Sequence, residues 1–547
     1  MTGLGEALKI VKNLLIRPYV LLAIIILVQT LLMCYYADQK SAYHRDEYYS
    51  IIQTNGNLSG TRIAYEEDWF DQWHSSEYFR NFTTVQHGER FIFRPAYKTL
   101  SKDAHPPFYF MQLHAISSLF PDTFDNRMGA FVNIFWLAAA NIMLYLVSRL
   151  VLRHKYLALL PCAVWGFSAG AMSCAVLFRP YAVLTFFFTA LLFLTVLLIT
   201  GKRKADLKFC IVFGLVFFFG FLTQYYFIIF FIFAAAGLIF WFFYKREYKQ
   251  LRNCVITTGA SFAVYIAVWP AAIKGIFGSG RGAESFTSIM RTEGFFDRIK
   301  SYIKVIDNSL FGNEKLIIVF AIIAIVLLIV RLILYFRKGT VIKQGPGTDA
   351  FLLVFLLLVT VPYVLIIARI TPYVYDRYIF AVYPALILLF LTFYYQALFA
   401  INRKAAPVLL VVISIIVIAV GFHDKPVQYI YKDAIDTKAI IQSYENPVCI
   451  AVQKSSNMGK ANDQHIFDFE AFNWTYICKS TDSFLIALND VNTGQDLLLY
   501  LIKDLDKDEI FEGLYNMIPY KNAEFIYSTL VNDVDNSTVY DVYHIEW

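Results

Sequence analysis

The chain has 547 residues, of which 58% are hydrophobic, 18% are aromatic and only 16% are charged. This composition excludes an ordinary soluble globular protein, in which about a quarter of the residues are charged, and it indicates an integral membrane protein. The formal net charge of +6 does not call for a nucleic-acid partner, because the basic residues gather in short loops between apolar segments.

Apolar segments of about 18 to 22 residues recur along the chain, and each is long enough to cross about 30 Å of hydrocarbon as a helix. We therefore expect an α-helical polytopic membrane protein with about eleven spans. The expected spans are Pro18–Tyr36, Asn126–Leu150, Tyr156–Phe178, Tyr181–Thr200, Phe209–Tyr225, Phe227–Tyr244, Cys254–Ile273, Leu316–Tyr335, Ala350–Ala368, Tyr378–Ala400 and Val408–Phe422. The third and fourth spans, and the fifth and sixth, are so close that either pair could be one broken element. The first span is longer than the apolar part of a signal peptide, so we expect a retained anchor.

The basic loops predict the orientation, because short cytoplasmic loops collect Lys and Arg. With the N-terminus inside, every short inside loop is basic, for example "GKRKADLK" at 201–208 and "YKREYKQLR" at 244–252. The segments then expected on the outer face are 37–125, 178–182, 274–315, 370–378 and the tail from His423.

The tail differs in composition from the rest of the chain. Residues 1–422 are expected to form the membrane domain, and 423–547 a small extracytoplasmic α/β domain in which runs such as "VCIAVQ" and "LLLYLI" are strands. Cys449 and Cys478 both fall in this tail, and the sequence leaves open whether they form a disulfide in an oxidising compartment.

Two acidic segments lie on the expected outer face. Asp46 and Glu47 in "SAYHRDEYYSI" follow the first span, where a simple interfacial ion pair with His44 or Arg45 is the alternative to a catalytic role. Asp103 and His105 precede a Pro-Pro pair in "SKDAHPPFYF", which would equally suit a capped helix start.

Three arginines end spans on the same expected face: Arg179, Arg369 and Arg377. Snorkelling to the interface would account for each alone. If they converge with the acids, they would make a site able to hold an anionic phosphate beside a carboxylate base.

The acidic pair, "DAHPPFY" at 103–109, "RPY" at 179–181 and "DRYIFAVYP" at 376–384, in this order, resemble motifs of the polytopic glycosyltransferases of the C superfold. That group includes protein O-mannosyltransferases, aminoarabinose transferases of lipid A, and bacterial transferases related to rhizobial lipopolysaccharide enzymes. The resemblance extends over roughly positions 15 to 420.

The resemblance implies a donor sugar carried on a polyprenyl phosphate and a catalytic acid in the first outer loop. Asp46 matches that acid, with Glu47 beside it; it would take a proton from an acceptor hydroxyl that attacks the anomeric carbon and inverts its configuration. Arg179 and Arg377, with Arg369 in reserve, would bind the phosphate, and Tyr181 and Tyr378 would position the substrate.

Other expectations are more open. Asp103 and His105 could bind the acceptor, orient Arg179 or hold a divalent ion with Asp46; no cofactor is expected, and a metal is not favoured. The acceptor could be a protein, a glycolipid or a cell-wall glycan. The loop from Lys274 to Lys315 is expected to cover the donor cavity.

The stretch 65–82 would either lie in the headgroup plane through Trp69, Phe70, Trp73 and Phe79, or pack as an ordinary loop helix.

Two rival classes compete with the transferase. A transporter or flippase of a lipid-linked saccharide would share the spans, although it should carry its ionisable groups near the bilayer midplane. A membrane receptor or assembly protein whose outer tail binds a partner would leave the motifs "HRDEYYS" and "DAHPPFYF" without a role. A bacterial plasma membrane is the expected location, since no lectin-like module lies between the spans.

Overall fold

The computed structural model describes residues 17–55, 69–103, 105–277, 294–312, 315–338, 350–423, 427–453, 464–503, 505–530 and 538–547. Its contacts divide the chain into two compact units. The first unit comprises Met1–Asp38, Ser101–Tyr109 and Ala130–Gln428, and the second comprises Gln39–Leu100, Phe110–Gly129 and Tyr429–Trp547. The second unit therefore joins most of the first long loop to the C-terminal segment.

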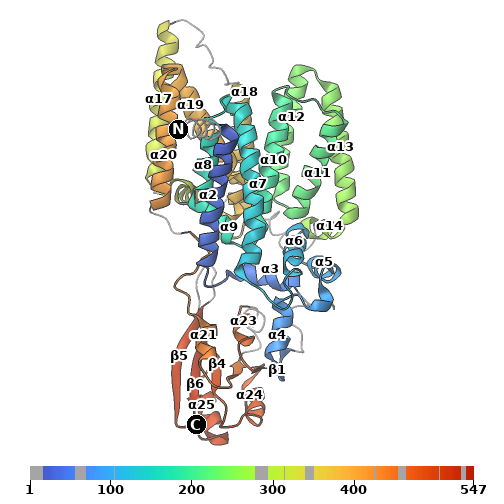
Figure 1. Cartoon of the computed structure of the whole chain (residues 1–547), viewed down its shortest axis with the longest axis vertical. Helices are drawn as coiled ribbons and strands as arrows, with labels where there is room; N and C mark the ends of the chain where they lie inside the picture. Colours follow the sequence, from blue (N-terminus) through green and yellow to red (C-terminus); the bar gives the residue numbers. More distant parts are fainter. Residues whose placement is uncertain are drawn as a thin grey trace, which may run out of the picture. The chain divides into compact units, whose positions relative to one another are not determined.

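Helices build the first unit (Figure 1). They are α2 (Pro18–Asp38), α7 (Asn126–Leu152, whose first turn belongs to the second unit), α8 (Leu159–Gly166), α9 (Ala169–Val176), α10 (Tyr181–Ile199), α11 (Leu207–Thr223), α12 (Phe227–Lys245), α13 (Tyr248–Val268), α14 (Ala271–Phe277), α16 (Phe295–Ile306), η3 (Asp307–Phe311), α17 (Leu316–Lys338), α18 (Ala350–Ile370), η4 (Asp376–Tyr378), η5 (Phe380–Val382), α19 (Tyr383–Ile401) and α20 (Ala405–His423). Residues 278–293 and 313–314 of the expected cavity-covering loop lie outside the described residues.

The expected spans correspond to helices of this unit. In the described part of the chain, seven helices are long and apolar enough to cross a membrane, two bent helix pairs each make one further candidate, and α11 and Ala405–Gly421 are shorter apolar helices. The prediction of an α-helical polytopic membrane protein with a small C-terminal α/β domain is confirmed.

The third expected span is not one straight helix, because α8 and α9 meet at an angle of 62°. Ser168 sits at the break as the N-cap of α9, and its hydroxyl oxygen accepts a hydrogen bond from the Ala171 N–H. This cap satisfies one of the backbone donors that a helix start leaves open.

A buried polar contact ties α8 to its neighbours. The Gln29 side chain of α2 donates to the Cys162 carbonyl over 3.0 Å, and Asn141 of α7 donates to the Gln29 side-chain oxygen. The amide of Gln29 lies against Gly166, where a Cβ would stand 2.1 Å from its nitrogen. A glycine is therefore required at the end of α8.

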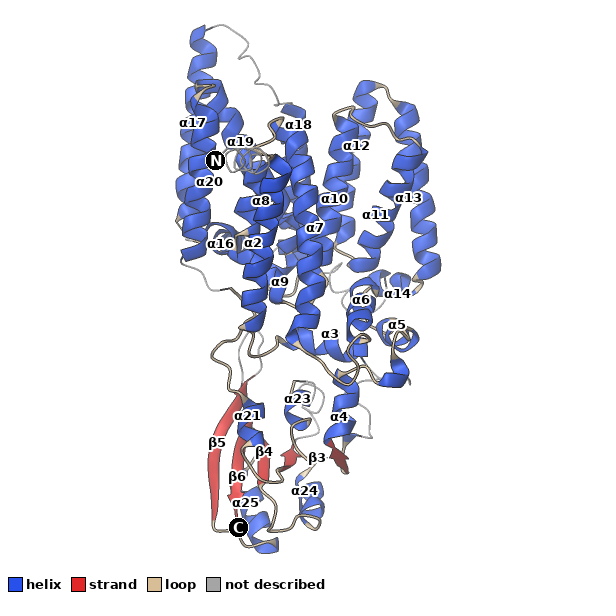
Figure 2. Ribbon diagram, in the orientation of Figure 1, coloured by secondary structure: helices blue, strands red, loops and turns tan. Residues whose placement is uncertain are grey.

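The second unit contains all the described strands (Figure 2). Its elements are α3 (Arg45–Asn55), β1 (Trp73–Ser75), α4 (Ser76–Thr83), η2 (His87–Glu89), α5 (Arg94–Leu100), α6 (Phe108–Ser117, which starts in the first unit), α21 (Thr437–Gln442), β2 (Val448–Val452), α23 (Ile466–Phe469), β3 (Trp474–Cys478), α24 (Thr481–Leu488), β4 (Leu497–Ile502), α25 (Lys507–Met517), β5 (Asn522–Leu530) and β6 (Thr538–Glu546).

The strands form one sheet in the order β1-β3-β2-β4-β6-β5. The central strand β2 pairs in parallel with β3 and β4, whereas the outer pairings are antiparallel. Every residue of β2 and β4 is buried, as expected for apolar strands covered on both faces.

The edge strand β1 comes from the first loop, and this corrects one expectation. Trp69, Phe70 and Phe79 are buried in a hydrophobic core with C-terminal residues such as Phe469 and Phe472. Their placement in the lipid headgroup plane is wrong, since β1 pairs with β3 and carries its flanking aromatics into that core. Residues 65–68 lie outside the described residues.

The two C-terminal cysteines are free and buried. Cys449 lies opposite Thr475 in the β2–β3 register, and Cys478 lies opposite Val452. This offset of three positions along paired strands amounts to about 10 Å, so the structure does not support the disulfide.

Candidate functional site

The first turn of α3 carries both acids of the first motif. Glu47 is fully buried, and its carboxylate forms an ion pair with Lys40 over 2.9 Å. The same carboxylate oxygen accepts the His44 N–H over 2.7 Å, while Lys40 also donates to the Tyr429 carbonyl. Burial lowers the pKa of Lys40, and the neighbouring Glu47 opposes that change. Glu47 thus has the surroundings of a residue that fixes the start of α3.

Asp46 has different surroundings. Its residue is half-buried, and its backbone is held on both sides, because its N–H donates to His44 Nδ1 over 3.1 Å and its carbonyl accepts from the Ser50 hydroxyl. His44 itself is buried. The sequence treats Asp46 and Glu47 alike, whereas the structure buries Glu47 completely and pairs it with the buried Lys40, and leaves Asp46 half-buried.

Asp103, His105 and Arg179 of the first unit form a chain of hydrogen bonds. The Asp103 carboxylate lies 2.7 Å from His105 Nδ1, and Arg179 Nη2 lies 2.7 Å from His105 Nε2. A guanidinium can only donate, so Nε2 accepts and the ring proton sits on Nδ1, facing Asp103. Of the roles left open for the acid and the histidine, orienting Arg179 is the one with direct geometric support.

Arg179 is buried in the turn between α9 and α10. Its N–H donates to the Leu177 carbonyl over 2.7 Å. The Asn133 side chain of α7 donates to that same carbonyl over 2.6 Å and to the Ala175 carbonyl over 3.1 Å. Sequence reasoning missed Asn133; an amide in the middle of an apolar span was the available signal.

Arg377 lies among aromatic rings. Its guanidinium carbon lies 4.2 Å from the centre of the Tyr375 ring and 5.3 Å from that of Tyr378. The Tyr378 ring in turn makes edge contacts with Tyr181 at 6.4 Å and with Tyr226 at 5.9 Å. The expected pair Tyr181 and Tyr378 is therefore in contact, which brings the turn of Arg179 beside the turn of Arg377. Tyr226 is a further member that the sequence did not single out.

Arg369 has a separate environment at the end of α18. Its guanidinium stacks on the Phe295 ring, with 4.8 Å to the ring centre. A neighbouring cation, Arg298, donates to the carbonyls of Ala368 and Thr371 and so satisfies the end of α18. Arg298 thus has a structural role at the end of α18, and the expected phosphate-binding role of Arg369 stays a prediction.

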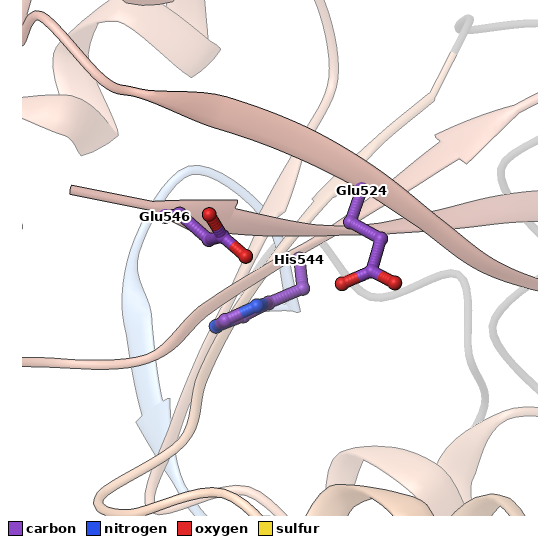
Figure 3. A group of neighbouring side chains, drawn as sticks. All are labelled: Glu524, His544 and Glu546. Carbon is purple, nitrogen blue, oxygen red and sulfur yellow. The ribbon is translucent and has the colours of Figure 1, made fainter.

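Among the described residues, one group of side chains could hold a metal ion, and it lies on the C-terminal sheet (Figure 3). Glu524 of β5 faces His544 of β6 in the register, and Glu546 follows on β6, with ligand atoms within 4.8 Å of one another. Both glutamates are exposed, and His544 Nε2 already pairs with Asp496 over 3.0 Å. None of the predicted site residues belongs to this group.

No family model and no curated protein sequence matches the chain. In structure, the chain is similar to ArnT from Cupriavidus metallidurans bound to undecaprenyl phosphate, with 11% identity, a TM-score of 0.46 and coverage of 96% of this chain and 97% of that one. The apo form of that ArnT gives 10% identity, a TM-score of 0.45 and the same coverage.

A third similar structure is the apo oligosaccharyltransferase of Archaeoglobus fulgidus, with 11% identity, a TM-score of 0.41 and coverage of 95% of this chain and 74% of that one.

Proposed function

We propose that the protein is an inverting glycosyltransferase that moves a sugar from a polyprenyl-phosphate carrier to an acceptor hydroxyl on the outer face of a bacterial plasma membrane. The observation that carries the proposal is the Asp103–His105–Arg179 chain. A buried guanidinium held by a neutral histidine and a carboxylate is preorganised to receive an anion. Preorganised donors of this kind stabilise charge that develops on a leaving group.

The chemistry follows from the charges. The leaving group is a phosphate monoester anion, so the bond from the anomeric carbon to the phosphate oxygen breaks with its electron pair on the phosphate. Arg179 and Arg377 bind that anion, and no proton has to be delivered to it. The acceptor oxygen forms the new bond to the anomeric carbon and passes its proton to Asp46.

Aromatic side chains supply the rest of the proposed donor site. Tyr378 lies beside Arg377, and the rings of Tyr181 and Tyr226 contact the ring of Tyr378; aromatic surfaces of this kind suit a sugar ring next to a phosphate. The partners proposed are a polyprenyl-phosphate sugar and a protein, glycolipid or glycan acceptor. The proposed orientation places the N-terminus in the cytoplasm and the C-terminal sheet outside.

A transporter or flippase of the same lipid is the second candidate, and the break between α8 and α9 favours it, because transporters bind substrates at broken helices. That break carries a serine cap and apolar neighbours rather than an ionisable group. It therefore lacks the charged residue that usually couples transport to an ion.

The test is turnover of radiolabelled polyprenyl-phosphate sugars, by transfer or slow hydrolysis, with purified protein. We expect wild-type turnover that is lost in Asp46→Asn with donor binding retained, and weaker donor binding in Arg377→Ala. Matched controls are Asp433→Asn and Arg403→Ala, which change exposed residues of the same types. A folded protein that neither binds nor turns over any donor would exclude the transferase, and lipid movement across vesicles would then support the second candidate.

A further inference from the structure

Two segments of the second unit, residues 85–93 and 118–122, are joined by hydrogen bonds and an ion pair. We call these two segments together the clasp. The Asp122 N–H donates to the Val85 carbonyl over 2.9 Å, and the Asp122 carboxylate lies 3.2 Å from His87 Nε2. Ser118 makes the other junction: its carbonyl accepts from Arg90 Nε over 2.8 Å, and its hydroxyl accepts from the Phe91 N–H over 2.9 Å.

The clasp turns large apolar side chains outward. Five of them are between 37% and 56% exposed: Phe91, Ile92, Phe93, Leu119 and Phe120. An apolar cluster of this kind on a folded surface marks a place of interaction.

The backbone of the clasp is strained where its aromatic side chains project. Phe91 adopts a left-handed conformation with φ at +57°, which is unfavourable for a residue with a Cβ. The hydrogen bond from the Phe91 N–H to Ser118 holds this conformation. Strain that the surroundings maintain is a reason to look for a function of the exposed ring.

The clasp lies a few residues before a membrane-spanning helix in the chain. Phe120 stands six residues before Asn126, the first residue of the membrane-spanning helix α7. Six residues reach at most about 20 Å, so the clasp is tethered close to the membrane interface.

Charge supports the lipid bilayer as the partner. Four exposed cations and two exposed acids flank the apolar cluster, so its exposed charge is net positive: Arg90, Arg94, Lys98 and Arg127 against Asp122 and Asp125. Aromatic and aliphatic side chains ringed by Lys and Arg are typical of surfaces that insert into the interfacial layer of membranes with anionic lipids.

We propose that the clasp inserts its apolar side chains into the headgroup layer of the bilayer, with Arg90 and the neighbouring Arg94 and Arg127 against anionic lipid. It would thereby anchor the second unit to the membrane at a point other than the membrane-spanning helices. The anchor is independent of the reaction proposed above, because none of its residues belongs to the candidate site.

The proposal is tested by spin labels on the full-length protein in liposomes of phosphatidylcholine and phosphatidylglycerol. Labels are placed by Ile92→Cys and Phe120→Cys on a background in which the exposed Cys34 is replaced by alanine. Ile486→Cys is the matched control, because Ile486 is an exposed apolar residue on α24 of the same unit. Accessibility to oxygen, which concentrates in lipid, is compared with accessibility to a nickel chelate equilibrated on both sides.

We expect the ratio of oxygen to nickel accessibility to be several-fold higher at positions 92 and 120 than at position 486, and to rise with the fraction of phosphatidylglycerol. Ratios equal to that of position 486 would overturn the proposal. Low accessibility to both reagents, with dipolar broadening between labels, would also overturn it, since the face would then belong to a second copy of the chain.

Discussion

At the scale of single residues, the orientation of Arg179 depends on a histidine that must stay neutral. A protonated imidazole has no acceptor nitrogen for the guanidinium, and an alanine removes the acceptor altogether. We therefore predict that His105→Ala lowers donor turnover on the order of 10–100-fold, because misplaced groups cost rates of this size. His105→Asn, whose carbonyl can accept, should restore part of the rate.

The matched control for His105→Ala is His87→Ala, which alters an exposed histidine. The measurement is kcat and KM for a labelled polyprenyl-phosphate sugar. The loss should appear in His105→Ala, be smaller in His105→Asn and be absent in His87→Ala. Equal losses in His105→Ala and His105→Asn would contradict an acceptor role for this ring.

The adjacent acids Asp46 and Glu47 should respond differently to neutralisation. Glu47→Gln leaves Lys40 buried without its anionic partner, and breaking a buried ion pair costs about 3–5 kcal/mol. Asp46→Asn should leave stability nearly unchanged while it removes activity. Thermal unfolding of both variants in detergent measures the difference, and Lys40→Met combined with Glu47→Leu should recover most of the loss. Equal melting temperatures for the two single variants would refute the structural role of Glu47.

A buried acid of the C-terminal segment predicts a pH dependence of stability. Burial raises the pKa of Asp468 above its ordinary 3.8, and His465 and the Thr437 hydroxyl oppose the change. Because the pKa of Asp468 is raised in the folded state, the contribution of this carboxyl to stability is greatest below pH 3.8. That contribution is lost as the pH rises through the folded-state pKa. Asp468→Asn does not titrate, so we predict that it melts higher than wild type at pH 7 and that the gain shrinks towards pH 4. A gain that is constant with pH would refute this assignment.

At the scale of elements, the packing of α8 on α2 depends on Gly166. An alanine Cβ there would overlap the Gln29 amide, which cannot move without losing its bonds to Cys162 and Asn141. We predict that Gly166→Ala lowers stability by about 1–3 kcal/mol. Gly259→Ala in α13 is the control, because a Cβ there meets nothing within 4 Å. The comparison is made by unfolding midpoints, and similar midpoints would show that the contact is loose.

The spans could be predicted from sequence because crossing a membrane requires a long apolar helix, and that requirement is local. The break at Ser168 could not be predicted, since Leu159–Val176 is apolar enough for one continuous span. The bend depends on Ser168, Gly166 and the neighbouring Gln29. The sequence predicted that Tyr181 and Tyr378 lie on the same outer face, but it did not predict that their rings are in contact. Asn133 and Arg298 were missed for the same reason: each acts on a backbone carbonyl of another element, which no spacing along the chain reveals.

At the scale of the whole molecule, the sheet of the second unit draws on two segments nearly 400 residues apart. β1 begins at Trp73, and β3 begins at Trp474. Sequence patterns predicted strands in the C-terminal segment but not β1, because three residues carry too little alternation to indicate a strand. The burial of Trp69 and Phe79 follows from this long-range pairing.

The β1–β3 register can be tested by a cross-link. Trp73 lies opposite Tyr476, and opposed residues of an antiparallel pair have Cα atoms about 4.5–5.5 Å apart, within the range of a disulfide. On a Cys478→Ala background, we predict that Trp73→Cys with Tyr476→Cys forms a disulfide under mild oxidation. Trp73→Cys with Trp474→Cys, displaced by two positions or about 7 Å, should not. Peptide mapping after proteolysis distinguishes the two, and a cross-link in the displaced pair alone would mean that the first loop joins the C-terminal sheet in another register.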